Sequence, residues 1–91
     1  MVEIIEKDPE AVLDYTVDWT LDLVVGDPIA ASSFAVPAGI TKDSESDDGA
    51  SKTTVFLSGG MLGEIYDIVN HITTVGGRED DKTFKIKMTH R

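Results

Sequence analysis

Apolar and polar residues alternate along two stretches near the C-terminal end of the chain. Tyr66, Ile68, Asn70 and Ile72 fall at every second position, and after the polar residues 76–81 the alternation resumes at Phe84, Ile86 and Met88. Successive side chains of a strand point to opposite faces of the sheet. The pattern therefore predicts a β-hairpin over 65–88 with one buried face and one solvated face.

The longest alternating run lies nearer the N-terminus and predicts a further strand over residues 13–25. A straight strand of that length is unusual, so we expect it to be bent or interrupted near Trp19 and to end before the breaker Gly26-Asp27-Pro28. Trp19, together with Tyr15 and Tyr66, is expected in the core. The apolar residues of the run occupy every odd position: Leu13, Tyr15, Val17, Trp19, Leu21, Leu23 and Val25.

The middle of the chain is divided by turn signals. Residues 29–36 predict a strand in which Ile29 and Phe34 are out of phase, which a bulge or a crossing between sheets would explain. Residues 53–57 predict another strand, followed by a turn at Ser58, whereas residues 42–51 are so polar that we expect an exposed loop. Without a convincing amphipathic helix, these short strands indicate an all-β sandwich or small barrel.

Composition limits the chain to one small, acidic domain. It has 91 residues, no cysteine and a net charge of −9, so neither a disulfide framework nor a thiolate metal site supports the core. An acidic surface repels phosphate backbones, which argues against nucleic-acid binding. No apolar run is long enough to span a bilayer and the first residues are acidic, so we expect a soluble protein without a membrane partner.

The charge is unevenly placed, with eight acids and one lysine in residues 1–27 and only basic charges in residues 82–91. The favoured interpretation is a solvated surface, and the alternatives are head-to-tail packing of copies or docking on a basic partner.

Candidate chemistry is sparse. Asp43, Glu45 and Asp47 follow the spacing of a calcium loop, but its glycine is replaced by Asp48 and its final acid by Thr54, so a solvated loop is favoured over a weak calcium site. The two histidines cannot by themselves complete a zinc site. The sequence indicates neither an activated nucleophile nor a pair of carboxyl groups with a raised pKa. We expect no cofactor, no metal and no enzymatic activity.

Four separated segments resemble a known family. They are residues 7–15 with Asp18-Trp19, residues 29–40, residues 55–60, and residues 70–86 with the turn Gly76-Gly77-Arg78. In this order they resemble the fiber-tail adaptors, small virion proteins of tailed phages. The resemblance implies an immunoglobulin-like β-sandwich of about six to eight short antiparallel strands. It also implies several copies in a ring around the tail or neck, linking the tail to fibres or neighbouring proteins such as the tail tube or nozzle and the adaptor. By the same resemblance, the protein would be located in the virion, after assembly in the host cytoplasm.

Within this hypothesis we expect residues 1–8 to form an extended arm and residues 9–91 a single sandwich domain. The acidic loop and the arm depart from the family pattern, which leaves open which surface meets which neighbour. The alternatives are a ligand-binding or capsid-decorating sandwich and a host-directed inhibitor of a basic partner. The residues expected to contact partners are Val2, Ile4 and Ile5 of the arm and Asp43, Glu45, Asp47 and Asp48 of the loop, within residues 43–49.

Overall fold

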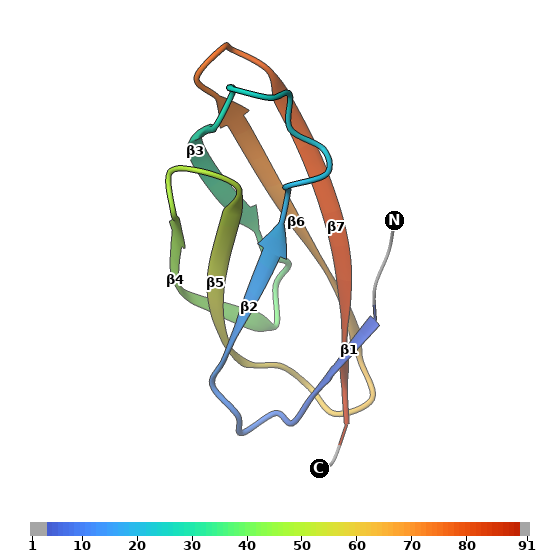
Figure 1. Ribbon diagram of the computed structural model, residues 1–91. Helices are drawn as coiled ribbons and strands as arrows, with labels where there is room; N and C mark the ends of the chain where they lie inside the picture. Colours follow the sequence, from blue (N-terminus) through green and yellow to red (C-terminus); the bar gives the residue numbers. More distant parts are fainter. Residues whose placement is uncertain (1–3, 90–91) are drawn as a thin grey trace.

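The computed structural model describes residues 4–89, which form seven strands in two facing sheets without a helix (Figure 1). One sheet has the order β1-β7-β6-β3 and the other the order β2-β5-β4. The prediction of an all-β sandwich is confirmed, with one difference: β1 runs parallel to β7. The strands are β1 (Ile4–Lys7), β2 (Leu13–Asp18), β3 (Ile29–Ala35), β4 (Ile40–Asp47), β5 (Lys52–Gly59), β6 (Ile65–Thr74) and β7 (Glu79–Met88).

The predicted C-terminal hairpin is confirmed as β6 and β7, which pair in antiparallel register from Ile65 opposite Lys87 to Thr73 opposite Glu79. The alternation assigns the faces correctly, because Tyr66, Ile68, Asn70, Ile72, Phe84, Ile86 and Met88 are all buried.

The strand predicted over 13–25 is interrupted where expected, but its second half is wrong. β2 ends at Asp18, and the backbone N–H groups of Asp22 and Leu23 then donate to the Trp19 carbonyl, which curls the chain into turns. Asp18 Oδ1 also accepts a hydrogen bond from the Thr20 backbone N–H. Odd positions after Trp19 therefore lose the common face, and Leu21 and Val25 are 98% and 100% exposed.

The middle strands confirm the predicted bulge and correct the predicted loop. The register of β3 with β6 shifts between Ile29 and Ala31, which places both Ile29 and Phe34 in the core. Residues 42–47 of the predicted loop instead continue β4, which pairs with β5 as far as Asp47. The turn predicted at Ser58 is also wrong, because β5 extends to Gly59. β4 is an edge strand and is exposed after Ile40, so its polar side chains face water while its backbone groups pair with β5.

The N-terminal strand brings opposite charges together. Because β1 runs parallel to β7, Glu6 lies beside Lys87, while Lys85 pairs with Asp67 of β6 at 2.6 Å. Glu6 thus lies in the same sheet as the basic residues of β7, whereas Asp14 and Asp18 lie on β2 of the other sheet.

The core consists of two clusters between the sheets. The larger cluster includes Tyr15, Val55, Leu57 and Phe84, and the smaller one consists of Trp19, Ile29 and Ile72. Trp19, Tyr15 and Tyr66 are all buried, as the sequence predicted. The smaller cluster holds Trp19 fully buried where β2 ends, so the loop that follows starts from a fixed point.

Candidate docking surfaces

Glu45, one of the predicted contact residues, forms bonds within the chain. Its carboxylate accepts a 2.8 Å hydrogen bond from the Phe34 backbone N–H of β3 and pairs with Lys42 at 2.9 Å. The Lys42 ammonium in turn donates to the Phe34 carbonyl at 3.1 Å. This ion pair satisfies both backbone groups of Phe34 and thereby caps β3, an edge strand that would otherwise offer them to another chain.

The other predicted acids lie on β4 and on the turn after it. Asp47 Oδ1 accepts from the Gly49 backbone N–H, and Asp48 Oδ1 accepts from Ala50, Ser51 and Lys52. These bonds lower the pKa of Asp48, led by the one from Lys52. Asp43 is exposed, and its charge favours the protonated form of Lys7. The acids therefore form an acidic edge in which Asp47 and Asp48 also hold the turn.

The predicted arm is described from Ile4 onward, and Val2 lies outside the described residues. Ile4 begins β1, whereas the half-buried Ile5 packs against the larger core cluster. Lys7 is fully buried and donates to the carbonyls of Gly59 at 2.8 Å and Asp8 at 3.0 Å. Burial lowers the pKa of this ammonium group. The contacts of Ile5 and Lys7 fasten β1 to the body of the sandwich.

Most exposed apolar side chains lie near the two ends of the long axis, on loops or, for Ile65, at the first residue of β6. The connections β2–β3 and β6–β7 lie at one end, and β1–β2 and β5–β6 at the other (Figure 1). The molecule is 42 Å long and 23 by 19 Å across, so the two groups lie far apart. The first group, here the loop tip, is Leu21, Val24, Val25 and Val75; the second, here the loop base, is Val12, Met61, Leu62 and Ile65.

Asp27, which is 8% exposed, holds the loop tip together. Its carboxylate accepts hydrogen bonds from Thr74 Oγ1 and the Gly76 backbone N–H, both at 2.6 Å, and from Arg78 Nη1 at 2.9 Å. These donors, Thr74 first, lower the pKa of the carboxyl group. The bonds join the β2–β3 loop to the β6–β7 turn and so hold together the two segments that carry the loop tip.

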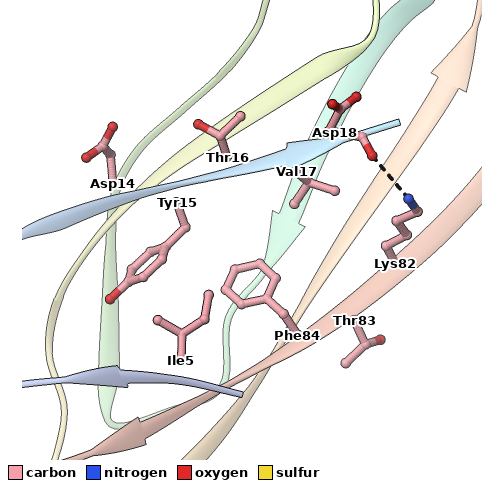
Figure 2. Close-up of a pocket in the computed structure, with 9 residues that line it drawn as sticks. All are labelled: Ile5, Asp14, Tyr15, Thr16, Val17, Asp18, Lys82, Thr83 and Phe84. Carbon is pink, nitrogen blue, oxygen red and sulfur yellow. Dashed lines mark hydrogen bonds between the residues drawn. The ribbon is translucent and has the colours of Figure 1, made fainter. Parts of the chain in front are cut away.

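A groove of about 390 Å³ opens between β2 and β7 (Figure 2). Tyr15 and Val17 point into it from β2, Phe84 from β7 and Ile5 from β1, while Asp14 and Asp18 stand on the opposite side of β2. Lys82 bounds the groove at one end, because its ammonium donates to the Asp18 carbonyl at 3.2 Å and lies 4.9 Å from the centre of the Trp19 ring.

His71 lies on the solvated face of the hairpin, as its phase predicts. Its Nδ1 is 2.6 Å from Asp81 and its Nε2 is 2.9 Å from Glu79. The two carboxylates, Asp81 first, raise the pKa of the imidazole. Across residues 4–89 no group of three or more His, Asp or Glu side chains is arranged to hold a metal ion. The same residues contain no helix that is long and apolar enough to cross a membrane.

Sequence reasoning missed the loop tip, because it assigned Leu21 and Val25 to a buried strand face. The available signal was Asp18 followed by Thr20, a spacing typical of an Asx turn, which ends the strand several residues before the breaker at residues 26–28. It also missed the bonds of Asp27 and the caps on Phe34, since each joins residues that are distant along the chain.

The two facing sheets define a small immunoglobulin-like β-sandwich. Its structure is similar to the solution structure of the PKD domain from the KIAA 1837 protein, with a TM-score of 0.54 and 12% identity over 98% of this chain and 82% of that one. The family model described as podophage GP4 fiber-tail adaptor protein gp77 matches residues 7–87. The chain belongs to this fiber-tail adaptor family, which confirms the resemblance read from its sequence.

Membership gives the chain a structural adaptor role in the phage tail, and both family and fold are consistent with a protein that is not an enzyme. The search of curated proteins finds no match.

Proposed function

We propose that several copies of this chain stand in a ring on the tail or neck of the virion and link the tail to fibres or to neighbouring tail proteins. The supporting observation is the pair of exposed apolar surfaces, the loop tip and the loop base, at opposite ends of a molecule 42 Å long. A linking protein needs two separate contacts, and large exposed apolar groups are typical of contact sites. A ring multiplies modest interfaces of this kind.

The same proposal assigns further contacts to the acidic edge of β4, around Asp43, and to residues 1–8. β1 pairs with β7 through only four residues, so the equivalent edge of a neighbouring copy could accept the same short strand. Residues 9–91 then act as the domain and residues 1–8 as its connecting segment, with tail tube or nozzle, adaptor and fibre proteins as the partners. Assembly takes place in the host cytoplasm, without nucleic acid or membrane as a partner.

The test is the composition and the map of purified particles. We expect mass spectrometry to detect the chain and cryo-electron microscopy to place the sandwich in a ring on the tail or neck. Val25→Asp at the loop tip and Met61→Asp at the loop base should each reduce the copies per particle, whereas Ser33→Asp, at an exposed position of β3 outside the proposed contacts, should not. Particles without the chain, or with the domain scattered over the capsid, would refute the proposal.

A further inference from the structure

The sandwich has two lateral seams, and side chains bridge them at different places: one at Phe34, and the other at Lys82, at one end of the groove. At the seam between β3 and β4, the Lys42–Glu45 pair caps the backbone groups of Phe34. At the other seam, β2 pairs with β5 alone, and β1 covers β7 only from Lys85 to Met88. In the described part of the chain, the outer edge of β2 and the outer edge of the first half of β7 therefore have no strand partner. The groove lies between these two edges.

The position of β1 explains the unpaired edges at this seam. In a constant-type immunoglobulin sandwich the first strand lies beside the second and completes a four-stranded sheet. Here the first strand lies beside the last one, so the sheet β2-β5-β4 has only three strands. Among residues 4–89, the place beside β2 is therefore left without a strand.

We propose that this groove binds an extended segment of another tail protein, which adds a strand to the edge of β2; the inference rests on the proposed adaptor function. Strand addition uses backbone hydrogen bonds for affinity and alternate side-chain sites for specificity. With Lys82 at one end and Ile5 at the other, the groove accommodates about five residues, or about 16 Å of strand.

The alternation of β2 specifies the chemistry of the segment. Side chains opposite Tyr15 and Val17 would enter the groove, where the rings of Tyr15 and Phe84 lie 5.9 Å apart, so these side chains are apolar. Side chains opposite Asp14 and Asp18 would lie on the outer face beside two exposed acids. Opposite charges across a strand pair stabilise it and like charges destabilise it. The partner segment therefore alternates apolar and basic residues.

A second copy of this chain does not meet that requirement at the edge strands of its described residues. β3 carries no basic residue, and β1 carries Glu6 and a fully buried Lys7. β2 itself presents Asp14 and Asp18, and β4 presents Asp43, Glu45 and Asp47, which would place acid opposite acid. The stretch with the required alternation is Phe84-Lys85-Ile86-Lys87-Met88, but it lies in β7 between β1 and β6. Charge complementarity therefore favours a different protein as the partner.

The first test uses the purified full chain, labelled with ¹⁵N, and two synthetic hexapeptides as probes. One peptide alternates lysine and valine, and the other alternates glutamate and valine. We expect the lysine peptide alone to shift the amide signals of residues 14–18 and 82–84. Asp14→Lys should weaken its binding about tenfold and favour the glutamate peptide, because it reverses a charge at the edge of the groove.

Glu64→Lys is the matched control, since it makes the same charge change at an exposed loop residue and should leave the preference for lysine unaltered. The proposal is overturned if neither peptide shifts these amides, if the shifts centre on β4, or if the same amides shift on dilution because a second copy occupies the groove.

Virions carrying the variants separate the two hypotheses. If the wild-type chain and Glu64→Lys are incorporated but Asp14→Lys is depleted, the groove is the docking site. If all three are incorporated equally, the adaptor function stands and the groove proposal fails. If even the wild-type chain is absent, the adaptor function fails, and the peptide titration by itself decides whether the groove binds a strand.

Discussion

The indole Nε1 of Trp19 donates a 2.8 Å hydrogen bond to Oδ1 of Asn70, joining the end of β2 to the middle of β6 across the core. The same oxygen accepts from Thr53 Oγ1 at 2.6 Å, and the Asn70 amide nitrogen donates to Ser32 Oγ and to the Ser33 carbonyl. All four hydrogen-bonding positions of this buried amide are therefore occupied, and it connects β6 and β3 of one sheet to β5 and the end of β2 in the other.

Replacing Asn70 with leucine is expected to lower the free energy of unfolding by about 3 kcal/mol, because the buried donors of Trp19 and Thr53 lose their acceptor. Urea denaturation followed by tryptophan fluorescence measures the change. Thr73→Leu, on the opposite face of the same strand, serves as the control and should change stability by less than about 0.5 kcal/mol. Equal midpoints for the two variants would contradict the role of this network.

The bonds of Asp27 predict a stability effect that depends on pH. The folded-state pKa of Asp27 lies below its ordinary value of 3.8, so its stabilisation is present above that value and is lost as the pH falls through the folded-state pKa. Asp27→Asn should therefore lower the melting temperature at pH 7, and the difference from wild type should shrink in strong acid.

Asp80→Asn is the matched control, because the Asp80 carboxylate is exposed on β7. This variant should melt close to wild type at pH 7. A difference between Asp27→Asn and wild type that stays constant down to the lowest pH would contradict this assignment. Hydrogen exchange adds a second readout, because the Gly76 amide, which donates to Asp27, should exchange faster in Asp27→Asn.

The two carboxylates beside His71 predict a pH dependence of stability opposite in sign to that of Asp27. Its pKa is raised above 6.5, so the stabilisation is fully present below that value and is lost as the pH rises through the folded-state pKa. An NMR titration of the imidazole should give a midpoint above 6.5. Asp81→Asn should lower this midpoint more than Glu79→Gln, because the bond to Asp81 is the stronger cause. The reverse order would show that Glu79 is the dominant partner.

The cap on β3 predicts a change in association. Glu45→Ala removes the acceptor of the Phe34 backbone N–H and releases Lys42, so the edge becomes available for pairing with another strand. We expect concentration-dependent self-association in sedimentation velocity experiments. Asp43→Ala, on the same strand, makes the same charge change and should stay at the molecular mass of the wild type. If Glu45→Ala sediments like wild type, the cap has no protective role.

The sequence by itself determined the elements with local periodicity and the family. Alternation over 65–88 predicted the hairpin and its buried face, the phase change near Ile29 predicted a bulge, and four segments predicted the fiber-tail adaptor family. The strand predictions succeed because side chains in a strand alternate with a period of two, whereas the family prediction rests on the four segments themselves.

Only the tertiary structure decided the features that depend on pairing between residues distant in sequence. The polar residues 43–47 form a strand because β5 supplies its backbone bonds, and Leu21 and Val25 are exposed because β2 ends at Asp18. The caps on Phe34, the bonds of Asp27 and the groove beside β2 join residues that are distant in sequence. Local patterns carry no record of such contacts, which exist only once the two sheets are packed together.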